Sequence, residues 1–257
     1  MEEHVGSWLN PVAEALPAWL RPYLDVHLLF ALLVVVVLGT LAWASSRRLS
    51  LVPTGKLQSV GEWAYEGLLG LSRGILGHEA ERYVWVMGGF FVYILALNVL
   101  GLIPGFLSPS ARLNTTFALA LCSVTLAQVI GIRHNGLRYF TRFFICYKGI
   151  PVFPHLLKML EELIKPVSLA IRLFGNVFGD DTAVAQFAAL GAGALAVFGP
   201  SAVGAGVGLK IGGALGALLG VGITSMMISL ALLVAFIQAF VFALLTGSYI
   251  LFAIEME

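Results

Sequence analysis

The sequence predicts an all-α integral membrane protein, and two of its features predict this fold class. Of the 257 residues, 59% are hydrophobic and 11% are charged, whereas a soluble domain carries about 25% charged residues. Several uncharged runs also reach the roughly 17–25 residues that a helix needs to cross a bilayer. No alternating pattern of β-barrel strands is visible. Because a spanning segment must satisfy its own backbone hydrogen bonds, we expect a bundle of five to six helices.

The first part of the chain predicts an external segment, one span and one interfacial helix. Residues 1–26 carry several helix-breaking prolines and are expected to lie outside the membrane. The rest, residues 27–257, is expected to form a single membrane domain, whose first span covers about residues 27–45. In residues 56–78 apolar side chains recur at helical spacing and charged side chains lie off that stripe. This pattern predicts an amphipathic helix on the membrane surface.

Four further spans are expected. The second, about residues 83–103, ends at a Pro-Gly stop signal, and the third covers about residues 114–132. Residues 155–190 form a long helical pattern with an internal proline, Pro166, which predicts a kink or a break. With the last span, residues 211–254, this segment is expected to form a long tilted hairpin in the membrane.

A Gly/Ala-rich segment, residues 191–222, lies between these two patterns. Its glycines step by four, which favours either a smooth groove for close helix packing or a flexible hairpin. The sequence leaves both alternatives open. The steps are made by Gly204, Gly208, Gly212, Gly216 and Gly220.

The distribution of basic residues predicts the orientation. The loop after the third span carries four basic residues, the loop before it carries only Arg112, and Arg47 and Arg48 follow the first span. The positive-inside rule therefore places the basic loops in the cytoplasm, the N-terminus outside and the C-terminus in the cytoplasm. Without an obvious transit peptide, the chain is expected in a bacterial inner membrane.

Several classes of function are disfavoured. The formal net charge is +1 and no basic run suggests nucleic acid. The two cysteines, Cys122 and Cys146, have no metal-like spacing, and no HExxH motif is present. We therefore expect no metal, no cofactor and no enzymatic activity of the chain itself.

Arg172 is the most informative residue. It is the only formal charge between Pro166 and Gly179, and its guanidinium stays protonated at any accessible pH. At the centre of a membrane span an Arg costs roughly 2.5–3.5 kcal/mol, so such a residue usually serves a function and has a partner, expected here to be a carboxylate.

A polar stripe passes through Arg172 at three- and four-residue steps, the spacing of one helix face. Asp181 is nine residues from Arg172 and points to roughly the opposite side of the helix. In one alternative, Arg172 pairs with Asp180 and only locks two helices together. However, two helical turns, roughly 12 Å of rise, separate them. The stripe consists of Glu161, Lys165, Ser168, Arg172, Asn176 and Asp180.

These residues carry a family resemblance. The run from Lys165 to Asn176, KPVSLAIRLFGN, resembles the signature of the a subunit of F-type ATP synthases. The runs 98–105, 114–116 and 237–242, and Lys56-Leu57-Gln58 with Glu62, resemble other parts of that subunit. The resemblance covers the chain from about residue 27.

The resemblance implies a function. The a subunit is the ion-translocating, non-catalytic stator subunit of the membrane Fo sector. It stands beside a rotating ring of c subunits, binds peripheral-stalk b subunits and needs no cofactor. Two aqueous half-channels reach the ring, and the Arg that matches Arg172 contacts the ring carboxylate and blocks leakage. Proton flow is thereby coupled to rotation and ATP synthesis. A stand-alone secondary transporter or ion channel is the alternative, and the transported ion is a proton or sodium.

The resemblance also implies the site residues. Asn176 and Gln238 match polar positions near the Arg, and Asp181 matches the position of a half-channel carboxylate. Asp180 stands beside it, so either acid is a candidate relay group.

Four other residues are candidates for lining a half-channel. Glu161 and Glu162 either line the cytoplasmic exit or solvate a helix start and pair with Lys158 or Lys165. Ser168 is a candidate for lining a half-channel. Asn98 either lines a half-channel or makes a packing contact.

Overall fold

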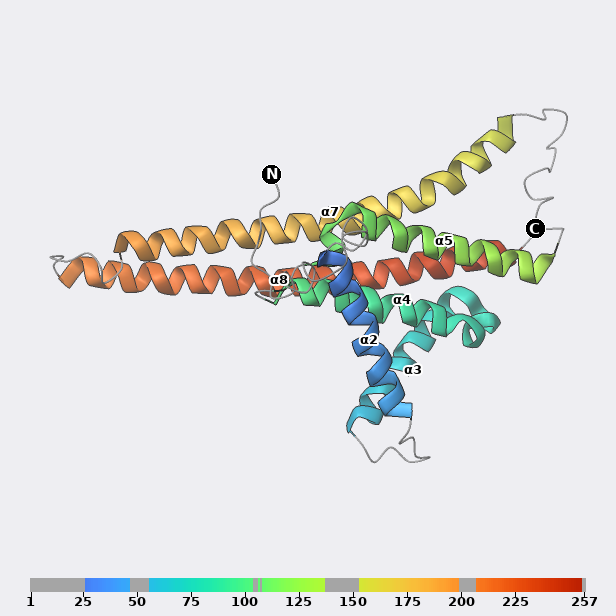
Figure 1. Ribbon diagram of the computed structural model, residues 1–257, viewed down its shortest axis with the longest axis horizontal. Coiled ribbons are helices and arrows are strands. Elements are labelled where there is room, and N and C mark those ends of the chain that lie inside the picture. The colour runs from blue at the N-terminus through green and yellow to red at the C-terminus, as the bar shows by residue number, and fades with distance from the viewer. Residues whose placement is uncertain are drawn as a thin grey trace, which may run out of the picture.

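The computed structural model describes residues 26–46, 56–103, 106, 108–136, 153–198 and 207–255. In these ranges it contains six α-helices, two short 3-10 helices and no strand (Figure 1). The α-helices are α2 (Val26–Ser46), α3 (Lys56–Leu76), α4 (Ala80–Gly101), α5 (Leu113–Asn135), α7 (Phe153–Phe198) and α8 (Val207–Ile254). The 3-10 helices are η1 (Gly77–Glu79) and η2 (Pro109–Ala111). The all-α prediction is confirmed.

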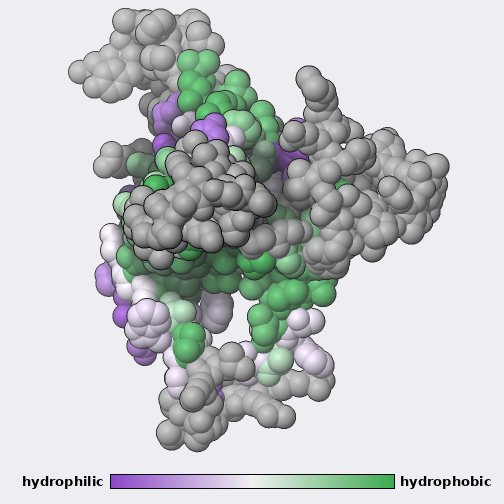
Figure 2. Space-filling model, turned by 90° about the vertical axis from the view of Figure 1, so that its left-hand side faces the viewer, coloured by the Kyte–Doolittle hydropathy of each residue, from purple (hydrophilic) through white to green (hydrophobic). Residues whose placement is uncertain are grey.

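Four stretches of the described chain are long and apolar enough to cross a membrane. They are Val26–Ser45, Gln58–Gly101, Leu113–Asn135 and Val221–Ile254. Large apolar side chains are exposed along them, for example Val36 at 63% and Trp85 at 71%. Figure 2 shows wide hydrophobic areas on the described part of one face. Apolar surface of this extent suits lipid or a protein partner rather than water, so the chain is a multi-pass membrane protein.

Helices α7 and α8 are the two longest and lie side by side, antiparallel, along the long axis (Figure 1). They have 46 and 48 residues. At 1.5 Å per residue each is about 70 Å long, more than twice the thickness of a hydrocarbon core. Both helices extend into the Gly/Ala-rich segment 191–222, on either side of residues 199–206, which lie outside the described range.

Helix α7 curves away from α8 toward its N-terminal end (Figure 1). Pro166 lies inside this helix without ending it. A proline removes one backbone hydrogen bond and crowds the preceding turn, which accounts for a bend. Of the two outcomes expected at Pro166, a kink or a break, the chain shows continuous but bent helix.

The core lies where α4, α5, α7 and α8 meet. Ile94, Ala120, Leu173 and Phe242, one from each helix, are all fully buried in it. Helix α3 folds back against α4 through the turn at Gly77, whose φ of 55° is easy for glycine and costly for other residues.

Some sequence expectations fall outside the described residues. These are the external segment up to residue 25, the Arg47 and Arg48 loop and most of the basic loop after α5.

Candidate functional site

Arg172 lies at the edge of the exposed face of α7. One side of this helix packs into the core through Leu169, Leu173 and Val177. The other side exposes apolar residues, with Ile164 at 52% and Ile171 at 57%. Arg172 is itself exposed, and its guanidinium makes no hydrogen bond or ion pair with any other residue of the described chain.

Arg172 and Asp180 form no ion pair. The structure therefore differs from the alternative in which this pair only locks two helices together. The helical repeat explains why. Each four-residue step turns a side chain by about 40° around the axis, so Asn176 and Asp180 rotate progressively toward α8. Arg172 therefore stays exposed while Asp180 is half-buried.

Asp180 lines a small cavity between α4, α7 and α8. Three amide side chains line it as well: Asn98 from α4, Asn176 from α7 and Gln238 from α8. The Nδ2 atom of Asn176 donates a hydrogen bond of 2.6 Å to Oε1 of Gln238. The remaining lining is apolar and consists of Leu102, Val177, Ala231, Val234 and Ala235.

Two of these amides keep buried atoms without a protein partner. Asn98 is 4% exposed and Gln238 is 3% exposed. Both amide atoms of Asn98 and the Nε2 atom of Gln238 lack a hydrogen bond. A buried polar atom left unpaired costs about 1–3 kcal/mol. The cavity volume of about 10 Å³ is close to the smallest that holds one water molecule. The site is therefore built for a small polar occupant such as water.

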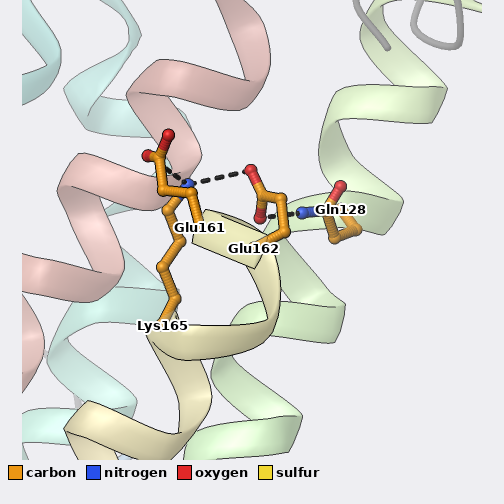
Figure 3. Close-up of polar contacts among 4 residues, drawn as sticks. All are labelled: Gln128, Glu161, Glu162 and Lys165. Atoms are coloured by element: carbon orange, nitrogen blue, oxygen red, sulfur yellow. Dashed lines mark hydrogen bonds and ion pairs between the residues drawn. The ribbon is translucent and has the colours of Figure 1, made fainter. Parts of the chain in front are cut away.

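A second polar cluster lies nearer the N-terminal end of α7 (Figure 3). The Nζ atom of Lys165 is 2.8 Å from Oε1 of Glu162 and 3.4 Å from Oε1 of Glu161. The Nε2 atom of Gln128, on α5, donates a hydrogen bond of 2.7 Å to Oε2 of Glu162. Both glutamates thus pair with Lys165, one of the partners expected from the sequence.

Tyr249 of α8 completes this cluster. The Nζ atom of Lys165 lies 5.5 Å from the centre of its ring. A second cavity opens among these groups. It is lined by Val124, Ala127, Gln128, Glu162, Lys165, Tyr249 and Ala253.

Glu162 and Asp180 lie on the same side of α7, because 18 residues make five full helical turns. Glu162 is about 15 Å and Asp180 about 12 Å from Arg172 along the axis, in opposite directions. Two polar cavities therefore lie to either side of one exposed cation.

The two remaining site residues predicted from the sequence, Ser168 and Asp181, both belong to α7. Ser168 is exposed on α7 between the two cavities. The structure describes the backbone of Asp181, which is helical, but not its side chain. In the described ranges, no group of three or more His, Cys, Asp or Glu side chains comes close enough to hold a metal ion.

Sequence reasoning missed Gln128 and Tyr249. Each is a polar side chain in an otherwise apolar span, and that is the one signal that could have indicated them. Their meeting with Glu162 depends on how α5 and α8 pack against α7.

Comparison with known proteins identifies the family. The sequence profile of the ATP synthase A chain family matches residues 27–251. ATP synthase subunit a of Moorella thermoacetica is 40% identical over 153 residues, which are 59% of this chain and 68% of that protein. The subunit a of Protochlamydia amoebophila is 33% identical over 174 residues, 64% of this chain and 63% of that protein. ATP synthase subunit a 1 of Syntrophotalea carbinolica is 36% identical over 164 residues, 63% of this chain and 69% of that protein.

The match to Protochlamydia amoebophila thus spans less than two thirds of that relative's length, and the other two span slightly more. The family match covers nearly all of the present chain. The resemblance noted in the sequence is confirmed, and this multi-pass membrane protein belongs to the ATP synthase A chain family.

Proposed function

We propose that this chain is the ion-translocating stator subunit of the Fo sector of an F-type ATP synthase in a bacterial inner membrane. It catalyses no reaction itself. It stands beside a ring of c subunits, is held by peripheral-stalk b subunits, and offers two half-channels to the ring. Proton flow through them drives rotation and thereby ATP synthesis.

The observation that carries this proposal is that Arg172 is exposed on a largely apolar face of α7 and that its guanidinium pairs with no residue in the described part of the chain. A guanidinium cannot neutralise itself, so exposure to lipid would be costly. A partner surface with a carboxylate removes that cost. The ring supplies such a surface, and the carboxylate at Arg172 changes as the ring turns.

In this proposal, Arg172 has two effects on the ring. A nearby cation favours the ionised form of a carboxylate, so a ring site that reaches Arg172 gives up its proton. The same fixed charge repels protons and blocks direct passage between the two half-channels. The membrane potential supplies about 2.3 kcal/mol per proton per 100 mV.

The cavity beside Asp180 supports the assignment of one half-channel. Its lining combines a carboxylate with the amides of Asn98, Asn176 and Gln238, which can hold water in a chain that reaches toward Arg172. Asp180 is our candidate relay group, and Asp181 stays the alternative.

Replacement of Arg172 tests the proposal. In inverted membrane vesicles that contain the whole complex, Arg172→Ala should abolish ATP-driven proton pumping without loss of assembled complex. Arg172→Lys should also fail, because a lysine is a compact, strongly hydrated charge that deprotonates more readily when buried. Arg133→Ala, an exposed arginine at the end of α5, is the matched control and should pump normally.

Normal pumping by either Arg172 variant contradicts the proposal. Ion transport by the isolated chain in liposomes, without ring subunits, would favour a stand-alone transporter or channel instead. Dependence of pumping on sodium concentration separates a sodium carrier from a proton carrier.

A further inference from the structure

We propose that Met87 of α4 is a positioning residue for α8: its side chain fills a notch at Gly247 and sets how far α8 lies from α7. Through that distance it holds Tyr249 at the polar cavity beside Lys165. This inference rests on the function proposed above, because its effect on pumping requires that α8 forms part of the transport path.

Gly247 is a notch in α8 because the structure leaves no room for a side chain there. A carbon atom in the Cβ position of this residue would lie 2.6 Å from Cε and 2.8 Å from Sδ of Met87. Both distances are shorter than 3.0 Å, an approach that packed Cβ atoms do not make. At Gly222, on the same helix, a Cβ would meet nothing within 4 Å. The end of the methionine therefore occupies the space that any other residue at position 247 would fill.

Met87 itself has little room to move aside. It is 2% exposed, and its Sδ atom lies 3.4 Å from the hydroxyl oxygen of Ser72, which is fully buried on α3. Because protein interiors are close-packed and transmit strain, a side chain added at position 247 should displace α8 rather than Met87. The buried neighbours of Met87 come from α3, α4, α5 and α8 and are Leu76, Ala80, Tyr83, Ala127 and Ile250.

The notch and Tyr249 lie on opposite sides of α8. At 3.6 residues per turn, two positions are separated by about 200° around the axis and about 3 Å along it. Gly247 faces α4, whereas the ring of Tyr249 faces α7, where its centre lies 5.5 Å from Nζ of Lys165. A push at the notch therefore moves Tyr249 toward Lys165 and into the cavity that both residues line.

The spacing of α7 and α8 also sets the geometry of the cavity beside Asp180. The 2.6 Å hydrogen bond from Asn176 to Gln238 crosses the same pair of helices. Displacement of reacting groups by about 1 Å can cost up to about 100-fold in rate. A small displacement of α8 should therefore slow transport even in a complex that is fully assembled.

The first experiment measures ATP-driven proton pumping in inverted vesicles that contain the whole complex, with rates divided by the amount of assembled complex. We expect Gly247→Ala to lower this rate by at least about fivefold, because the added methyl group displaces α8. Gly222→Ala, the same change in open space on the same helix, is the control and should pump at close to the parent rate. A parent rate for Gly247→Ala overturns the inference.

A second substitution tests whether Met87 is the cause. Met87→Ala alone leaves the notch empty and should also slow pumping. In the double variant, the atoms that meet the new methyl group are gone, and the methyl group fills part of the void. The double variant should therefore pump several-fold faster than Gly247→Ala and faster than Met87→Ala, a coupling expected only for residues in contact.

A contact that only adds stability makes a different prediction. Gly247→Ala would then lower the amount of assembled complex and leave the rate per complex unchanged. A double variant that pumps no faster than Gly247→Ala also overturns the inference. If Gly247→Ala does not assemble at all, the double variant must restore assembly, and its failure to do so has the same meaning.

The second experiment reads the position of α8 directly, without any measurement of transport. The hydroxyl oxygens of Ser123 on α5 and Thr246 on α8 lie 2.8 Å apart. Ser123→Cys with Thr246→Cys should therefore form a disulfide when membranes are treated with an oxidant. The two native cysteines, Cys122 and Cys146, are first replaced by alanine so that they cannot compete.

Cross-linking by this pair should respond to the notch. Gly247→Ala should slow it several-fold, because the displaced α8 carries the neighbouring position 246 with it. Addition of Met87→Ala should restore the rate, and Gly222→Ala should leave it unchanged. An unchanged cross-linking rate in Gly247→Ala means that α8 has not moved and overturns the positioning role.

Arg172→Ala, measured in parallel, separates the two proposals. Normal pumping by this variant removes the proposed function, whereas the cross-linking results still decide whether Met87 positions α8. A dead Arg172→Ala together with parent pumping and cross-linking rates in Gly247→Ala leaves the proposed function in place and removes only the role of Met87.

Discussion

The side-chain amide of Asn176 donates a 2.6 Å hydrogen bond to the side-chain oxygen of Gln238, and this bond joins the two longest helices one turn from Arg172. Its donor is on the helix that carries the cation, and its acceptor is buried on α8. The amide nitrogen of Gln238, Nε2, has no hydrogen-bond partner, and Gln238 lines a cavity together with Asp180. The bond thus fixes the wall of a polar cavity as well as the distance between two helices.

Gln238→Leu should therefore affect transport more than stability. The change removes one hydrogen bond, worth about 0.5–1.5 kcal/mol, but it also puts an apolar side chain into the cavity wall. We expect pumping per assembled complex to fall by about tenfold, as for other losses from a proton-transfer path. Ser229→Ala is the control on the same helix, because the Ser229 hydroxyl bonds only within α8, to the carbonyl of Ser225. Similar pumping by the two variants would count against a role for Gln238 in the path.

Asp180→Asn and Asp181→Asn decide which acid acts as the relay. Asp180 lines the cavity with Asn176 and Gln238, so we expect its replacement to slow proton pumping strongly and that of Asp181 to have the smaller effect. Pumping rates of the two variants in inverted vesicles provide the measurement. The reverse order assigns the relay to Asp181, and parent rates in both variants remove the two acids from the pathway.

Asn98→Leu should separate stability from transport. The two buried, unpaired amide atoms of Asn98 carry an energetic cost of about 1–3 kcal/mol each, and leucine has a similar shape without that cost. Thermal unfolding of the variant complex should therefore occur at the parent temperature or above it, while pumping falls. A variant that is destabilised and pumps normally would indicate that Asn98 makes a packing contact, the other alternative that its sequence position leaves open.

Ser123→Ala tests a purely structural polar contact. The hydroxyls of Ser123 on α5 and Thr246 on α8 lie 2.8 Å apart and are fully buried, and neither residue lines either cavity. Thr246 keeps its bond to the carbonyl of Phe242, so the loss should be about 0.5–1.5 kcal/mol of stability. Pumping per assembled complex should stay at the parent rate, and a clear drop in that rate would assign this hydroxyl pair a role in transport.

The fold class was predictable because it depends on composition and on the length of apolar runs, which are local properties. The run around Arg172 was informative for the same reason, since its charge pattern and motif are contiguous. Helix ends were harder to place. Alanine and glycine beyond residue 190 neither begin nor end a helix sharply, and α7 continues to Phe198.

The cavities themselves were not predictable from the sequence. Asn98 and Gln238 are 140 residues apart and share a cavity only because α4 and α7 both pack against α8. Gln128 and Tyr249 meet Glu162 in the same way. A single polar residue in an apolar span forms no periodic pattern with other polar residues. Nothing in the sequence therefore indicates which helix it will face.

The most direct test of the central claim is a cryo-electron microscopy map of the assembled complex that resolves the side chain of Arg172 and its neighbours. We predict that the guanidinium faces a carboxylate of the c-subunit ring, either in direct contact or through one water molecule. An Arg172 that faces lipid, or that pairs with an acid of its own chain while the ring carboxylates stand elsewhere, would contradict the account.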